Sequence, residues 1–199
     1  MTLRNIKKLY SFTFAFLFFW LYIPHFIIYL VSSNRALINE DIKAAIETNK
    51  LGGLGNKLTS LLFLLHTDSY FRTVFYYRIG VACKTVLEIY RPGNKYFLIP
   101  HDVKVGGGIG YNHPFSTILQ AKEIGKNFRC RNNTTIGNKN GQNPVIGDNV
   151  YLGVGAIVIG DIKIGNNVVV GAGSVVVKDV PDNAVVVGNP ARVVKYINK

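Results

Sequence analysis

The sequence predicts a mainly β protein, in which a solenoid of parallel β-strands follows an α-helical N-terminal region. Two observations predict the solenoid. Apolar residues recur every six positions in the C-terminal half, at Ile146, Leu152, Val158, Ile164, Val170 and Val176. A second series lies four positions after the first, at Val150, Ala156, Ile162, Val168 and Ser174.

A strict period of six needs a coil of three short strands. Helices repeat apolar positions every three or four residues and ordinary strands every two, so neither explains it. In a coil of three strands, one apolar side chain per strand points inward and glycine or another small residue turns each corner. Glycine follows several inward positions, as in Ile146-Gly147 and Leu152-Gly153. The pattern therefore predicts a solenoid built from hexapeptides.

The repeat continues upstream with two irregularities. It includes the inward positions Val105, Tyr111, Thr117, Ile124, Cys130 and Ile136. One extra residue falls between Thr117 and Ile124, and four fall between Ile136 and Ile146, within residues 137–144. Insertions must leave a solenoid as surface loops, which often carry chemistry. The 137–144 loop is therefore either functional or a tolerated insertion.

Length and charge restrict the class of protein. The 199 residues suit one domain with an accessory segment, and the net charge is +12. Residues 1–99 hold 12 basic and 5 acidic side chains, and residues 100–199 hold 11 and 6. A basic, aromatic-rich N-terminal half indicates an anionic membrane surface, or else a solubilising surface. No nucleic-acid-binding motif is visible.

Cysteine usage indicates a reducing compartment. Only Cys83 and Cys130 occur, and Cys130 occupies an inward repeat position, where a buried thiol is expected. Neither a disulfide framework nor a metal-binding set is present, so we expect no metal.

Residues 1–38 form an apolar segment that we expect to associate with a membrane. Residues 11–32, SFTFAFLFFWLYIPHFIIYLVS, could cross a bilayer as a helix, but Pro24 should break that helix near Tyr22–Ile23. Basic residues flank the segment on both sides, so charge does not orient it. We favour a re-entrant or monotopic helix over a full span, and packing against other subunits of a soluble protein is the remaining alternative.

Residues 39–97 are expected to be helical, followed by the β-helix at residues 98–199. The triplet Asn39-Glu40-Asp41 is expected to start a helix that Gly52-Gly53 ends. Arg72 and Arg78 lie among aromatic residues. That pattern is typical either of a membrane-interface belt or of a helix face that caps the end of a solenoid.

Three stretches give the C-terminal half a family resemblance. They are VGGGIGYNHPFS (105–116), IGDNVYLGVGAIVIGDIKIGNNVVVGAGSVVVKDVP (146–181) and GNPARVV (188–194). The half resembles the hexapeptide-repeat acyltransferases, especially serine acetyltransferases and the O-acetyltransferases of capsule and exopolysaccharide biosynthesis. The resemblance implies a left-handed parallel β-helix, a homotrimer and acetyl-CoA as co-substrate.

His113 matches the catalytic histidine of that family. Acetylation of a hydroxyl needs a general base that removes the alcohol proton, and a neutral imidazole suits this role near pH 7. A backbone N–H group could stabilise the charge on the thioester oxygen. The alternative is a surface histidine at a corner.

Departures from serine acetyltransferases favour a sugar acceptor. Those enzymes carry aspartate before the histidine, whereas Asn112 stands here, and Gln142-Asn143 replace their Arg-His pair. A neutral amide set suits a sugar hydroxyl or amide better than a carboxylate. A coil of 18 residues plus the extra one should place Asn132 beside His113, where it could orient the imidazole.

The resemblance also implies where the cofactor binds. Pantetheine would follow the backbone at Gly153-Val154 and Gly171-Ala172, where small residues permit close approach. Arg192 and Lys195 could meet the nucleotide phosphates. The alternatives are that the glycines only turn corners and that Lys195 is solvated.

The sequence thus predicts an acetyl-CoA-dependent O-acetyltransferase at the cytoplasmic face of the membrane. Its acceptor would be a sugar hydroxyl on a lipid-linked or nucleotide-linked precursor of capsule or exopolysaccharide. Serine O-acetyltransferase of cysteine biosynthesis is the first alternative, and a non-catalytic trimeric scaffold is the second.

Overall fold

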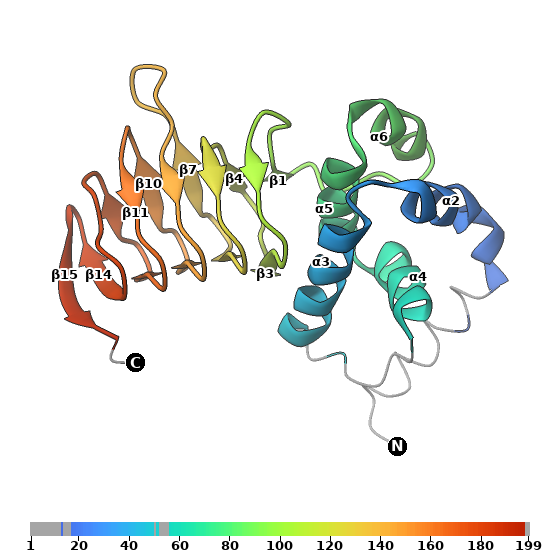
Figure 1. The fold of residues 1–199 in the computed structure, drawn as a ribbon, viewed down its shortest axis with the longest axis horizontal. Helices are drawn as coiled ribbons and strands as arrows, with labels where there is room; N and C mark the ends of the chain where they lie inside the picture. Colours follow the sequence, from blue (N-terminus) through green and yellow to red (C-terminus); the bar gives the residue numbers. More distant parts are fainter. Residues whose placement is uncertain (1–12, 14–16, 50, 52–55, 198–199) are drawn as a thin grey trace. The chain divides into compact units, whose positions relative to one another are not determined.

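The computed structural model describes residues 13, 17–49, 51 and 56–197, which fall into two compact units. The first unit comprises residues 1–94 and the second residues 95–199. The first is helical and the second is a β-solenoid (Figure 1). The predicted boundary between residues 38 and 39 falls inside one helix, α3 (Arg35–Thr48).

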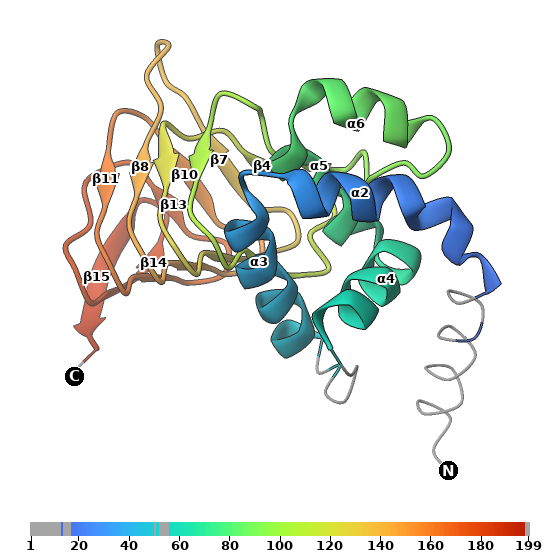
Figure 2. The same ribbon diagram turned by 45° about the vertical axis from the view of Figure 1, so that its right-hand side comes forward.

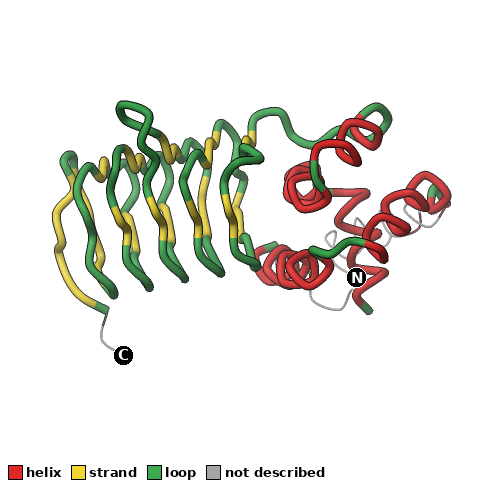
Figure 3. The backbone as a smooth tube through the Cα atoms, turned by 45° about the horizontal axis from the view of Figure 1, so that its top comes forward, coloured by secondary structure: helices red, strands yellow, loops and turns green. Residues whose placement is uncertain are grey.

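The described part of the helical unit contains one short 3-10 helix and five α-helices (red in Figure 3). They are η1 (Phe19–Tyr22), α2 (Ile23–Val31), α3, α4 (Lys57–Thr67), α5 (Ser69–Ile79) and α6 (Val81–Glu88). The predicted break at Pro24 is confirmed, because α2 begins at Ile23 after the 3-10 turn. Within the described ranges, no helix has both the length and the apolar character needed to cross a membrane. Most of residues 11–16 lie outside those ranges.

The start of α3 differs from the prediction. Asn39, Glu40 and Asp41 lie in the middle of the helix, which begins at Arg35. Asp41 is buried and forms an ion pair with Arg78, with Nε 2.8 Å from Oδ2 and both side chains 2% exposed. This acidic residue therefore serves a long-range pairing rather than a local cap. The predicted end at Gly52-Gly53 lies outside the described residues.

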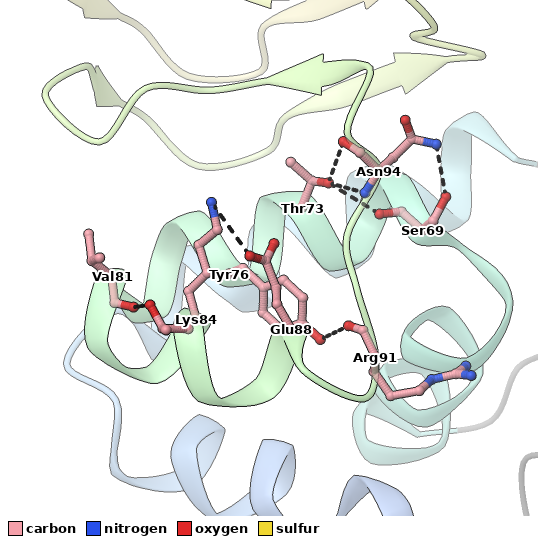
Figure 4. A network of polar contacts seen from close by, with 9 residues as sticks. Ser69, Thr73, Tyr76, Val81, Lys84, Glu88, Arg91 and Asn94 are labelled. Atoms are coloured by element: carbon pink, nitrogen blue, oxygen red, sulfur yellow. Dashed lines mark hydrogen bonds and ion pairs between the residues drawn. The ribbon is translucent and has the colours of Figure 1, made fainter.

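Polar contacts hold the segment after α6 against α5. Asn94 donates from its backbone N–H to Thr73 and from its side-chain amide to Ser69, and Tyr76 Oη donates to the Arg91 carbonyl oxygen (Figure 4). Arg72 also donates to backbone carbonyl oxygens, at Leu65 and Pro92. Arg72 and Arg78 thus both bind groups of the helical unit itself. The membrane-interface belt, one of the two interpretations of this pattern, stays a prediction.

His25 is buried in this unit beside aromatic hydroxyl groups. Its Nε2 lies 3.0 Å from Tyr76 Oη, and its side chain is fully buried. Burial, together with the positive charges of Arg91 and Arg72, lowers the pKa of His25 to about 4. The imidazole is therefore neutral at physiological pH and acts as part of the polar core.

The second unit is a parallel β-solenoid of about five coils (Figure 2). Its strands form three sheets. The five-stranded sheet has the order β1 (Phe97–Leu98), β4 (Thr117–Leu119), β7 (Thr135–Gly137), β10 (Ile157–Ile159) and β13 (Val175–Val176). The four-stranded sheet contains β2 (Lys104–Val105), β5 (Glu123–Ile124), β8 (Val145–Ile146) and β11 (Lys163–Ile164). The six-stranded sheet contains β3 (Gly110–Asn112), β6 (Arg129–Arg131), β9 (Tyr151–Leu152), β12 (Val169–Val170), β14 (Ala184–Gly188) and β15 (Ala191–Tyr196). The parallel solenoid is confirmed, and the left-handed sense of its coil stays a prediction.

The six-residue repeat fills the interior as predicted. The six members of the first apolar series, which runs from Ile146 to Val176 at every sixth position, are all buried. The upstream position Cys130 is 2% exposed. Burial raises the pKa of the Cys130 thiol to about 12, as expected for a structural cysteine. Thr117 is also buried, but the strand register aligns it with Thr134 of the second series, while Leu119 aligns with Ile136.

This register relocates the first irregularity. Tyr111 aligns with Cys130 and Leu119 with Ile136, so eight positions in the earlier coil match six in the next. The sequence predicted one extra residue after Thr117. The register instead shows two extra residues between Tyr111 and Leu119, followed by a segment from Leu119 to Ile124 that is one residue shorter than the regular repeat. The enlarged corner is the one that contains His113.

Asparagine ladders hold a different corner of the coils. Asn127, Asn149, Asn167 and Asn183 adopt positive φ angles of 55° to 61°, and their side-chain amides bond from coil to coil at 2.9–3.0 Å. Asparagine tolerates this left-handed region better than most residues. The recurring Asp/Asn-Asn pairs after glycine are thus explained by the fold.

Candidate active site

His113 lies at the corner that joins the six-stranded sheet to the five-stranded sheet. It follows β3 directly, has a positive φ of 51° and is exposed. The enlarged corner, residues 113–116, is tied to the next coil because Asn133 N–H donates to the Phe115 carbonyl oxygen at 2.8 Å. The imidazole therefore stands at an ordered and solvent-accessible position.

The register places four of the predicted site residues in one line. Asn112 pairs with Arg131, so His113 aligns with Asn132, as the sequence spacing predicted. Continuing through β9 and β12, Asn132 aligns with Val154 and Val154 with Ala172. We call these four aligned positions, His113, Asn132, Val154 and Ala172, the corner row.

A second row runs beside the corner row along the strand ends. It contains Asn112, Arg131, Gly153, Gly171, Val187 and Arg192. Five strand spacings separate its first and last members, or about 24 Å at the usual distance between paired strands. We call it the strand-end row. Lys195 pairs with Val185, two positions before Val187 of this row, and is exposed.

The polar side chains at and beside His113 have few hydrogen-bond partners in the described structure. Among the described residues, the side chains of Asn112, His113 and Asn132 make no hydrogen bond. The hydrogen bond by which Asn132 would orient the imidazole is therefore absent, although the two residues are neighbours. Its place as an orienting residue stays a prediction.

Gln142 and Asn143 lie at a different corner of the same chain. The 137–144 loop joins β7 to β8, between the five-stranded and four-stranded sheets, and projects from the solenoid (Figure 1). With Asp102, Glu123 and Asp161, the two amides line a polar pocket there. Within one chain the structure therefore does not bring them to His113, and their role at the acceptor stays a prediction.

The glycines of the strand-end row have a packing role of their own. A Cβ atom on Gly153 would lie 2.7 Å from the backbone N of Ala172, and one on Gly171 would lie 2.7 Å from the Val187 side chain. At Gly153 the obstacle is backbone, so the stacking of coils requires glycine there whether or not a ligand passes over it. At Gly171 the obstacle is a side chain, so a larger residue would need Val187 to shift.

Acidic side chains are absent from this part of the solenoid. The strands of the six-stranded sheet carry Arg129, Arg131, Arg192 and Lys195 but no aspartate or glutamate. No group of three or more potential metal ligands occurs in the described parts of the chain. The face suits an anionic ligand.

Comparisons with known proteins agree with this geometry. Residues 143–178 match the family model described as bacterial transferase hexapeptide (six repeats). The chain is 45% identical over 93 residues to Escherichia coli K12 "Putative colanic acid biosynthesis acetyltransferase WcaB", an alignment covering 45% of this chain and 57% of that protein. The solenoid is thus similar to the hexapeptide-repeat transferases, and the chain spans 57% of the length of the colanic acid protein.

Serine acetyltransferases are also similar to this chain. Arabidopsis thaliana serine acetyltransferase 3 is 40% identical over 96 residues, covering 46% of this chain and 25% of that protein. The structure of soybean serine acetyltransferase complexed with serine is 28% identical with a TM-score of 0.64, covering 81% of this chain and 70% of that one. A serine acetyltransferase complex with CoA, 22% identical and with a TM-score of 0.61, covers 80% and 68% and shares the fold.

Arg131 is not among the site residues predicted from the sequence. Its Nε donates to Tyr151 Oη at 2.7 Å, and its carbonyl oxygen accepts from the hydroxyls of Thr117 and Thr134. The strand register pairs Arg131 with Asn112, the residue before His113. The available signal was the 19-residue spacing that also located Asn132.

Proposed function

We propose that this protein is an acetyl-CoA-dependent O-acetyltransferase that modifies a sugar hydroxyl in capsule or exopolysaccharide biosynthesis. The observation that carries the proposal is the pair of aligned rows, with His113 at one end and Arg192 at the other. The similarity to the colanic acid protein supports a sugar acceptor. The left-handed coil and the homotrimer belong to the same proposal.

The chain supplies a base and a track for the cofactor. His113 takes the proton of the acceptor hydroxyl as its oxygen attacks the thioester carbonyl, and CoA thiolate leaves. A backbone N–H near the corner row stabilises the charge that develops on the thioester oxygen. Pantetheine follows Gly153-Val154 and Gly171-Ala172, and Arg192 with Lys195 binds the phosphates. No covalent enzyme intermediate is needed.

Serine O-acetylation is the second candidate function. The similarity to a serine acetyltransferase solved with serine favours it, because that likeness covers 81% of this chain. Against it stand Asn112 and the Gln142-Asn143 pair, which differ from the residues that the family uses for serine.

An acceptor panel decides between the two activities. Purified full-length protein and acetyl-CoA are mixed with L-serine or with neutral, uronic and nucleotide-linked sugars, and release of CoA thiol is measured. We expect transfer to at least one sugar class at a kcat/KM at least tenfold above that for serine. Preferred turnover of serine would replace the sugar proposal, and failure to bind acetyl-CoA by calorimetry would favour the scaffold alternative.

We also propose that the helical unit lies on the cytoplasmic face of the membrane. Apolar side chains are exposed on η1 and α2, including Trp20 (63%), Ile27 (56%) and Val31 (77%). The neighbouring helix α6 and the residue after it add Val86 and Ile89. Residues 1–94 carry 11 basic and 5 acidic side chains, a charge that complements anionic lipid headgroups. These features fit a helix lying in the membrane interface.

Vesicle flotation tests the membrane proposal. Ile27→Glu should lower the bound fraction of full-length protein about tenfold or more on vesicles with anionic lipid, because one buried apolar side chain is lost and a charge is added. The matched control is Ile118→Glu, on an exposed position of the solenoid that is 42% exposed. Equal binding of the wild type and both variants would contradict the proposed surface.

A further inference from the structure

Arg131 is a positioned cation one strand away from His113. It pairs with Asn112 across β3 and β6, and Asn112 directly precedes His113. Its Nε donates to Tyr151 Oη at 2.7 Å, which turns the side chain toward β9, the strand on the other side of β6 from β3. Its backbone is held by the hydroxyls of two buried residues, Thr117 and Thr134. The guanidinium group is therefore presented in a set orientation.

This guanidinium has no acidic partner among the described residues. Its side chain is half-buried, and only its Nε makes a hydrogen bond there, leaving both terminal nitrogens as donors. The acidic residues of the solenoid lie at the other two corners: Asp148 and Asp182 accept backbone N–H groups, and Glu123 and Asp161 line the polar pocket. A half-buried cation without a counter-charge is suited to an external anion.

The distance along the sheet separates Arg131 from the expected phosphate site of the cofactor. Four strand spacings lie between β6 and β15, which carries Arg192, or about 19 Å at the usual spacing. In contrast, Arg131 and the residue before His113 are direct strand partners. The backbone of Arg131 is thus nearer to the strand that precedes the base than to the expected nucleotide site, and we therefore assign its charge to the acceptor.

Resting on the proposed function, we propose that Arg131 binds an anionic group of the acceptor. The acceptor is then an acidic hydroxy compound, with a carboxylate or phosphate close to the hydroxyl that His113 deprotonates. A planar guanidinium with two free amino groups can bind either anion through paired hydrogen bonds. A uronic acid supplies the carboxylate, and a nucleotide-linked or lipid-linked sugar supplies the phosphate.

Matched acceptor pairs test this assignment on the full-length protein. Methyl glucuronoside is compared with methyl glucoside for the carboxylate, and UDP-glucose with glucose for the phosphate. We expect at least one anionic member to be preferred at least tenfold. Arg131→Gln should raise the KM for that acceptor about 10- to 100-fold, with little change for its neutral partner or for acetyl-CoA. Arg131→Lys should restore part of the preference.

Two further variants separate binding from folding. Arg129→Gln removes the other arginine of the same strand and should leave the acceptor preference unchanged. Tyr151→Phe keeps the charge of Arg131 but removes the bond that orients it, so a smaller rise in KM is expected. Melting temperatures of all variants, followed by circular dichroism, report any loss of structure.

The outcomes also separate this inference from the proposed function. Transfer to charged and neutral members at equal kcat/KM would overturn the role of Arg131 while leaving the sugar acetyltransferase in place. A rise in the KM for acetyl-CoA alone would assign Arg131 to the cofactor and overturn the inference as well. Transfer to no member of the panel would count against the proposed function itself.

Discussion

Replacement of His113 by asparagine is expected to lower kcat for acetyl transfer by about 10² to 10⁴, because the general base is lost. Asparagine is chosen since His113 has a φ of 51°, a conformation that asparagine tolerates and that strains alanine. The corner should therefore keep its shape. The rate is measured by CoA thiol release at saturating acetyl-CoA with the best acceptor from the panel.

His101→Asn is the matched control for that experiment. His101 is exposed and lies in the turn between β1 and β2, at a different corner. Its replacement should change kcat less than twofold. If His113→Asn retains the wild-type rate while still binding acetyl-CoA, His113 is not the base.

Breaking the buried ion pair of the helical unit is expected to have the largest effect on stability. Asp41→Leu or Arg78→Met alone should lower the free energy of unfolding by about 3 to 5 kcal/mol, because each leaves one charge buried without its partner. The double variant should be more stable than either single variant. Unfolding in urea is followed by circular dichroism and by the fluorescence of Trp20, the single tryptophan, which lies in this unit.

An exposed pair provides the comparison. Lys43 and Glu47 lie 4.0 Å apart on α3, with side chains 80% and 50% exposed, and Lys43→Met should change stability far less. Single variants at Asp41 and Arg78 that unfold like the wild type would show that the pair is not buried in solution.

Local spacing predicted the solenoid residue by residue. The inward positions from Ile146 to Val176, the buried thiol of Cys130 and the alignment of Asn132 with His113 follow from repeat length, which is a property of the chain alone. The helix break at Pro24 follows from the missing N–H group of proline. Each of these features depends on neighbours in the sequence or on a constant coil length.

Features that depend on distant partners were not predictable in this way. Asp41 resembles a helix cap in the sequence, yet it is buried in the core, where it pairs with Arg78, 37 residues away. Thr117 matched the first series by spacing, but the register assigns it to the second, because the insertion lies at the His113 corner. The placement of Gln142 and Asn143 away from His113 is also a consequence of which sheets the loop connects.

The sequence by itself determined the coil and its interior, because a six-residue period allows one regular arrangement of inward side chains. The candidate base, His113, came from the resemblance of its stretch to the acyltransferase family. Coil length alone also places Asn132 beside His113. The tertiary structure decided how the other side chains around that corner are held, because their hydrogen bonds form only when the coils stack in register. That stacking places Arg131 beside Asn112 and leaves the acidic residues at other corners.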